Sequence, residues 1–156
     1  MPELAMNVDP LIHTIELDSK KIRLQLWDLI FSPRYRLTSK ACYKGAKGIV
    51  MVYDVTSKES FEGAREWKQE VDDHQGEDTV LMLVGNKCDL ETQRQVSTEE
   101  GKQMAAELGV LFMETSALED VNVEDAFVSL IQSIKEIVEA RQLPTVKNES
   151  GSCILS

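Results

Sequence analysis

Two unbroken apolar runs limit most strongly what this chain can fold into. Residues 48–54 and 80–84 are apolar almost throughout, without the alternation of polar and apolar positions that a half-buried strand shows. Runs of this kind indicate strands that are buried on both faces of a sheet. An amphipathic helical pattern follows each run, opened by capping-box sequences at residues 56–59 and 97–100. Strands that alternate with helices predict an α/β fold with a mainly parallel sheet flanked by helices.

The remaining periodic segments complete the predicted order of elements. Residues 11–17 and 22–27 predict a hairpin that ends at Asp28, with a turn between the two strands. Residues 110–113 predict another short strand. Residues 126–138 carry apolar side chains at helical spacing and predict the last helix.

Net charge and cysteine content exclude several classes of function. The 156 residues carry a net charge of −10 and have a sequence pI of about 4.7. Nucleic acid is therefore excluded as a partner, because binding it requires a basic surface. The three cysteines, Cys42, Cys88 and Cys153, have neither the spacing of a metal site nor that of a disulfide framework. A reducing compartment is predicted, and no apolar run is long enough to span a bilayer.

Polar groups follow three of the predicted strands. They are Asp28, the loop Asn86-Lys87-Cys88-Asp89 and the pair Ser116-Ala117. In a parallel sheet, ligands bind beyond the carboxyl ends of the strands, so we expect these groups to converge. A buried carboxylate at Asp89 would accept the adjacent N1–H and amine of guanine and would discriminate against adenine, which lacks this donor pair. A polar loop without a ligand is the simpler interpretation of the four-residue motif alone.

Over residues 8–140 the chain resembles the Rab branch of the Ras-like small GTPases. Asn86-Lys87-Cys88-Asp89 is similar to the guanine-specificity motif of that family, and Thr115-Ser116-Ala117 to the loop whose backbone N–H supports the guanine carbonyl. Trp27-Asp28 is similar to the strand end before the second switch. The segments that resemble the Rab branch in particular are residues 22–27, 34–46, 51–56 and 121–127.

The resemblance implies a ligand, a metal and partners. GTP or GDP would be bound by Asn86, Lys87, Asp89, Ser116, Ala117 and Leu118, where Leu118 replaces the lysine of the family. Mg²⁺ would be bound by Asp28. Rab-type effectors or regulators would contact residues 22–46. The implied function is in vesicle and membrane traffic. The implied location is the cytoplasm, with peripheral attachment to the cytosolic face of an intracellular or plasma membrane.

Departures from the family pattern concern the phosphates. The 156 residues contain no Gly-x-x-x-x-Gly-Lys-Ser/Thr sequence, so the resemblance implies an incomplete small-GTPase (P-loop NTPase-like) fold without the first strand and first helix. Ala5 falls where the family has a Mg²⁺-binding threonine, and Phe31 and Ser32 fall where it has the glycine and glutamine used in hydrolysis. Because phosphoryl transfer depends on such groups, we expect weak or no GTP and GDP binding, a weakened Mg²⁺ site and no catalytic residue.

Three segments organise the chain in this interpretation. Residues 1–10 are an irregular start, residues 11–141 a truncated Rab-like domain and residues 142–156 a flexible tail. The tail ends in Cys153-Ile154-Leu155-Ser156, a prenylation box that predicts membrane attachment through Cys153. Two alternatives remain open: an ordinary GTP-binding Rab GTPase of which this chain is a truncated or splice form, and an unstable truncation product without function.

Overall fold

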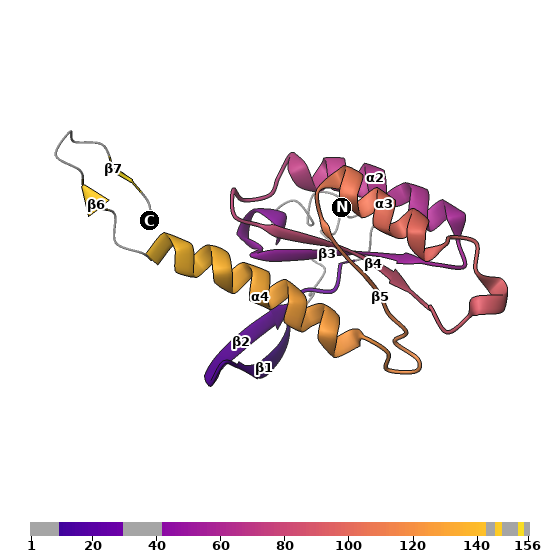
Figure 1. Ribbon diagram of the computed structural model, residues 1–156, viewed down its shortest axis with the longest axis horizontal. Helices are drawn as coiled ribbons and strands as arrows, with labels where there is room; N and C mark the ends of the chain where they lie inside the picture. The colour runs from indigo at the N-terminus through magenta and orange to yellow at the C-terminus, as the bar shows by residue number, and fades with distance from the viewer. Residues whose placement is uncertain (1–9, 30–41, 143–145, 148–152, 155–156) are drawn as a thin grey trace, which may run out of the picture. The chain divides into compact units, whose positions relative to one another are not determined.

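The computed structural model describes residues 10–29 and 42–142, together with the backbone of residues 146–147 and 153–154 (Figure 1). The chain divides into two compact units, residues 1–42 and 43–156, and each is described by itself. The predictions for residues 1–9 lie outside the described part, and so do those that concern Phe31, Ser32 and Pro144.

The first unit contains the predicted hairpin. Strand β1 (Leu11–Leu17) pairs antiparallel with β2 (Lys20–Leu26) along its whole length. Asp18 and Ser19 form the turn, with φ angles of 51° and 62°. Two-residue turns with positive φ match the twist of the strands that they join, so the turn is shorter than the four residues predicted at 18–21.

The second unit is built on a parallel sheet of three strands. They are β3 (Gly48–Asp54), β4 (Val80–Asn86) and β5 (Leu111–Glu114), in the order β3-β4-β5. This confirms the predicted α/β class. The bounds of β3 are those predicted, whereas β4 runs two residues further, to Asn86. The extension brings the start of the polar loop directly to the end of the strand.

Helices cover both faces of this sheet (Figure 1). α2 (Lys58–Asp72) and α3 (Thr98–Leu108) pack on one face, and α4 (Val123–Gln142) packs on the other. A short 3-10 turn, η2 (Glu91–Gln93), precedes α3. Within the described residues, no helix is both long enough and apolar enough to cross a membrane.

Two apolar clusters fill the space on either side of the sheet. The cluster beneath α2 and α3 comprises Met51, Tyr53, Val55, Phe61, Ala64, Leu83, Val96, Met104 and Ala105. The cluster beneath α4 comprises Met82, Val84, Ala126 and Leu130. Alternate residues of β4 therefore face opposite layers, which is why its sequence is apolar at every position.

Helix α3 begins as predicted and α2 does not. The Ser97 side chain accepts from the Glu100 N–H while the Glu100 side chain accepts from the Ser97 N–H, so the capping box of α3 is confirmed. The residue that caps α2 is Ser57, not Thr56. The Asp54 carboxylate accepts hydrogen bonds from both the N–H and the hydroxyl of Thr56, which directs the Thr56 side chain toward Asp54, and the Ser57 side chain accepts from the Ser60 N–H instead.

The prediction that β3 is buried on both faces is wrong at Val52. This side chain is 46% exposed, although its neighbours Met51 and Tyr53 are buried. β3 is an edge strand of the three-stranded sheet, and among the described elements only α4 packs on the face that Val52 shares. Val52 therefore stays exposed although the residues around it in the strand are apolar.

The structure describes the backbone of two short segments of the predicted tail. The backbone of β6 (Val146–Lys147) pairs antiparallel with that of β7 (Cys153–Ile154). The last helix extends to Gln142, one residue beyond the predicted domain boundary at residue 141.

Replacing Tyr53 by phenylalanine is expected to stabilise the protein by about 1 kcal/mol, since a buried hydroxyl without a partner costs about 1–3 kcal/mol. Tyr53 is 1% exposed, and its hydroxyl has no hydrogen-bond partner among the described residues. Burial, followed by the charge of Glu114, raises the pKa of Tyr53 to about 12. Thermal unfolding should show a melting temperature higher by about 2–4 °C. A lower melting temperature would mean that the hydroxyl makes a contact that stabilises the fold.

Candidate functional site

Two loops meet at the carboxyl edge of the parallel sheet. The first, residues 86–89, follows β4, and the second, residues 115–118, follows β5. The Cys88 N–H donates to the carbonyl oxygen of Thr115 at 3.0 Å, so the two backbones are joined directly. Lys87 turns the first loop with a φ of 65°, a left-handed conformation that is costly for a residue with a side chain. This conformation bends the chain away from the strand just after Asn86.

The Asn86 side chain joins the loops a second time. Its Oδ1 accepts from the Thr115 hydroxyl and from the Ala117 backbone N–H, each at 3.1 Å. The family resemblance assigns a backbone N–H of residues 115–117 to the guanine carbonyl, and the Ala117 N–H is one of these groups. Asn86 therefore aligns this donor within the loop and engages it at the same time.

Asp89 is tied to the second loop by the Ser116 side chain. The Ser116 hydroxyl donates to Oδ1 of Asp89 at 2.6 Å and accepts from the Glu119 N–H at 3.1 Å. Ser116 is fully buried, whereas Asp89 is exposed. Burial of Asp89 was the condition for strong discrimination against adenine, and the structure does not meet this condition, since Asp89 is exposed, as are Ala117 and Leu118 in the second loop. Within the described part of the chain, the other oxygen, Oδ2, accepts no hydrogen bond.

Lys87 forms an ion pair with the end of the neighbouring strand. Its Nζ lies 2.6 Å from Oδ2 of Asp54, the last residue of β3. Oδ1 of Asp54 accepts from the N–H and the hydroxyl of Thr56, at 2.8 and 2.6 Å. Burial opposes ionisation of Asp54, but the hydrogen bonds from Lys87 and Thr56 outweigh it and hold the pKa of Asp54 below its usual value.

A second ion pair supports the base of the β5 loop. Arg94 donates through two nitrogens to the two carboxylate oxygens of Glu114, at 2.8 and 3.1 Å. The Thr98 hydroxyl donates to the same carboxylate at 3.0 Å. Both charged side chains are less than one-sixth exposed. The Glu114 carbonyl oxygen accepts from the Asn122 side chain, so this pair fixes the strand end from which the loop leaves.

The protein-family model of the Ras family matches residues 3–136 of this chain. This chain belongs to the Ras family. It is 49% identical to the GTP-binding protein ypt2 of Schizosaccharomyces pombe over 131 residues, which are 84% of this chain and 66% of that protein. It is 46% identical to the Ras-related protein Rab-8A of Gallus gallus over 130 residues, 83% of this chain and 63% of that protein. These relatives assign the chain to the Rab branch.

Proteins of the Ras family bind GTP or GDP. Of the residues predicted to bind the base, the structure joins Asn86 to Ala117 and Asp89 to Ser116 by hydrogen bonds, while Lys87 and Leu118 lie in the same two loops. The chain spans somewhat less than two thirds of the length of the curated relatives named above, 63% and 66%. The activity and partners of these longer relatives are therefore only proposed for this chain.

Leu118 lies on a stiff loop beside the site. Ser116 and Val121 exchange two backbone hydrogen bonds, at 3.0 and 2.9 Å. Asp120 and Asn122 adopt left-handed φ angles of 53° and 57°, which these two residue types tolerate. Leu118 is 79% exposed at the tip. An apolar side chain thus replaces the charged lysine stem of the family at the border of the site.

Asp28 follows β2 and belongs to the first unit, whereas the two loops belong to the second. It is exposed, and Trp27 beside it is 48% exposed. No group of three His, Cys, Asp or Glu side chains that could hold a metal occurs within residues 10–29 and 42–142. The Mg²⁺ role of Asp28 and the lipidation of Cys153, whose side chain lies outside the described part, both stay predictions.

Sequence reasoning missed three residues of the site: Asp54, Arg94 and Glu114. Asp54 is the last residue of an apolar strand, as Asn86 is, so its place at a strand end could have indicated a site residue. Arg94 and Glu114 are twenty residues apart in different elements, so only the fold brings them together.

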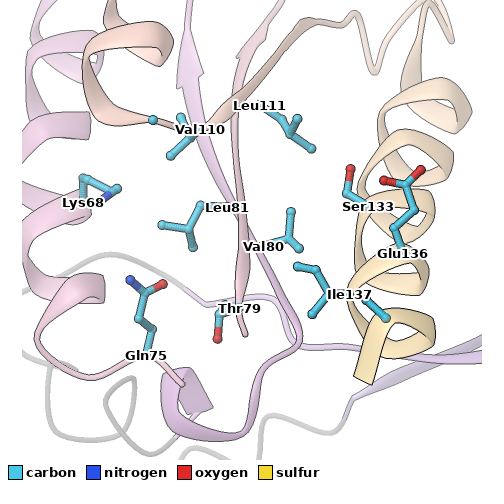
Figure 2. A pocket seen from close by; sticks show the side chains of 12 residues that line it. Lys68, Gln75, Thr79, Val80, Leu81, Val110, Leu111, Ser133, Glu136 and Ile137 are labelled. Atoms are coloured by element: carbon cyan, nitrogen blue, oxygen red, sulfur yellow. The ribbon is translucent and has the colours of Figure 1, made fainter. Parts of the chain in front are cut away.

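A hollow at the opposite edge of the sheet is a second candidate for a ligand-binding site (Figure 2). It has a volume of about 700 Å³ and is lined by the amino ends of β4 and β5 and by parts of α2 and α4. Figure 2 shows apolar side chains at its centre, with Lys68 and Gln75 on one side and Ser133 and Glu136 on the other. It offers an apolar surface and no convergent donors and acceptors for a base, so the two loops are the better candidate.

Proposed function

We propose that this chain is a Rab-branch protein of vesicle and membrane traffic whose residues 86–89 and 116–118 recognise a guanine base. The observation that carries the proposal is the double connection between the two loops, made by Asn86 Oδ1 and by the Ser116–Asp89 hydrogen bond. These bonds hold a carboxylate and a backbone N–H at one strand edge. Ligands of parallel α/β sheets bind at that edge.

The chemistry of the two loops fits guanine better than adenine. Oδ2 of Asp89 is available to accept from the N1–H and, together with Oδ1, from the exocyclic amine. The Ala117 N–H can share its proton between Asn86 and the guanine carbonyl. Adenine would present an amine where Ala117 needs an acceptor, and it has no N–H at N1. Such mismatches leave polar groups unpaired and lower affinity steeply.

The phosphates of a nucleotide contribute little to binding in this proposal. The 156 residues contain no glycine-rich phosphate loop, and Phe31 and Ser32 replace the residues that the family uses in hydrolysis. GTP or GDP would therefore bind weakly, through the base alone. GTP hydrolysis by these residues would not occur at the rate of ordinary small GTPases, because positioning and charge stabilisation supply nearly all of that catalysis.

Calorimetric titration with guanosine, GDP and adenosine tests the proposal. We expect guanosine and GDP to bind with dissociation constants within about threefold of each other, and adenosine to bind at least ~30-fold more weakly, a difference of about 2 kcal/mol. Equal affinity for guanosine and adenosine would overturn the base assignment. A GDP affinity about 100-fold above that of guanosine would overturn the independence from phosphate.

The chain would act through protein contacts at a membrane surface. Residues 22–46 would bind effectors or regulators, and a prenyl group on Cys153 would attach the chain reversibly to the cytosolic face of a membrane. The support is the Rab-branch relationship and the tail sequence Cys153-Ile154-Leu155-Ser156. An unmodified tail mass after expression in a eukaryotic cell would contradict the lipid anchor.

A second candidate is an ordinary GTP-binding Rab GTPase of which these residues form a part. The length comparison favours it, since the chain spans 63–66% of the two relatives. Upstream coding sequence with a glycine-rich phosphate loop would identify this case. The third candidate, a product that does not fold stably, would show no cooperative thermal transition.

A further inference from the structure

The ion pair between Lys87 and Asp54 is not needed to join the two loops of the base site. We propose that Asp54 is a positioning residue that fixes the Lys87 side chain and neutralises its charge, so that the site selects the uncharged guanine moiety and gains nothing from phosphates. This inference rests on the proposed function of the site. It assigns a role to a residue of β3 that makes no contact with the base.

Asp54 is a fixed point at the end of β3. Its N–H donates to the Ser60 hydroxyl at 3.0 Å, and Oδ1 accepts twice from Thr56. Ser60 belongs to the first turn of α2, so the strand end is anchored to the start of the next helix. With Oδ1 engaged in this turn, Oδ2 is the oxygen that faces Lys87, at 2.6 Å.

Of the two partners, Lys87 is the one whose side chain is ordered by the ion pair. Its side chain is 51% exposed, and a lysine so exposed would sample many rotamers without a partner. The Asp54 side chain is 24% exposed and already ordered, so it can hold the ammonium group at one place. The aliphatic stem of Lys87 then forms a stationary wall beside Asn86. The pair as a whole is neutral, and an anionic ligand finds no unpaired cation there.

Asparagine at position 54 isolates this contact. Asp54→Asn keeps an Oδ1 acceptor for Thr56 and replaces Oδ2 by an NH₂ group, which cannot accept from Lys87. The matched control is Asp78→Asn. Asp78 is 23% exposed, pairs with Arg141 and lies two residues before β4, at the other edge of the sheet. Both variants change the net charge by the same amount.

Competitive amine acylation tests the contact without any nucleotide. Lys102, which is 58% exposed and pairs with Glu99, serves as the internal reference within the same chain. In Asp54→Asn the acylation rate of Lys87 should rise about threefold relative to Lys102, because an amine released from its carboxylate partner is less ordered and more accessible to the reagent. In Asp78→Asn the ratio should stay unchanged. An unchanged ratio in Asp54→Asn would overturn the inference.

Titration with guanosine and GDP tests the consequence for selectivity. Asp54→Asn should weaken guanosine binding about threefold, since the ligand must now order the lysine. It should also raise the preference for GDP over guanosine about fivefold at low ionic strength, and the gain should fade near 1 M salt, where charges are screened beyond about 3 Å. Asp78→Asn should behave like the parent.

The two possible failures are distinguishable. If the parent binds guanosine and Asp54→Asn leaves the GDP preference unchanged, the role of Asp54 is wrong and the base site stands. If the parent binds no guanosine, the proposed function is wrong, and the acylation ratio alone decides whether Asp54 holds Lys87.

Discussion

Replacing Asp89 by asparagine is expected to weaken guanosine binding about 100-fold, or about 2.7 kcal/mol. The Oδ1 atom of asparagine still accepts from the Ser116 hydroxyl, so the joint between the two loops remains. The other oxygen becomes an NH₂ group, which would face the N–H donors of guanine and leave both sides unpaired. The exposure of Asp89 to water limits the loss, because a fully buried site would lose more. Calorimetric titration of parent and variant measures the change.

Asp120→Asn is the matched control for this experiment. Asp120 is exposed, lies in the neighbouring loop and has a left-handed φ of 53°, which asparagine adopts readily. It removes one negative charge near the site without touching the base contact. Equal losses in the two variants would show that net charge governs binding. An Asp89→Asn affinity within about threefold of the parent would rule out base recognition by this carboxylate.

Replacing Arg94 by leucine is expected to destabilise the protein by about 3 kcal/mol, because removing one partner of a largely buried pair leaves the other charge without compensation. Glu114 is 14% exposed and would retain only the Thr98 hydroxyl of its described partners. The Val96 carbonyl oxygen would also lose its bond from Arg94. Thermal or urea unfolding measures the effect, and a melting temperature lower by about 6–12 °C is expected for a chain of this size.

Arg65→Leu is the control for the Arg94 variant. Arg65 pairs with Glu107 at 2.6 Å, but the two side chains are 52% and 43% exposed. Exposed pairs contribute about 0–1 kcal/mol, so this variant should melt close to the parent. Similar melting temperatures for Arg65→Leu and Arg94→Leu would show that the Arg94–Glu114 pair does not stabilise the fold. A double variant of Arg94 and Glu114 to apolar residues should recover part of the loss.

The fold could be predicted from local patterns where those patterns had no competitor. β3 has the predicted bounds because seven successive residues suit a strand, and the Ser97–Glu100 box begins α3 as predicted. Thr56 was predicted to cap α2, but its N–H and hydroxyl both bind the side chain of Asp54, two residues earlier, and Ser57 caps the helix. The exposure of Val52 depends on which elements cover the sheet, and no local pattern reports that.

The site divides in a similar way. The motif residues Asn86 and Asp89 could be found because their spacing encodes their chemistry, and the parallel order of β4 and β5 brings Ser116 and Ala117 to them. The ion pairs of Asp54 and Arg94 could not be found from the sequence, because their partners depend on the strand register and on a tertiary contact. The exposure of Asp89 could not be predicted either, because it is set by the folded arrangement of the two loops and no local residue pattern reports it.

The hydrogen bonds that Asn86 makes across the two loops would make the proposed base site a preorganised receptor. Oδ1 of Asn86 accepts from both Thr115 and Ala117 and so links the two loops. A base that arrives there need not order the loops, and the conformational entropy lost on association is correspondingly small. Binding of this kind proceeds by rigid docking, with little movement of the backbone. The affinity at this edge of the sheet would then be determined almost entirely by the contacts with the base.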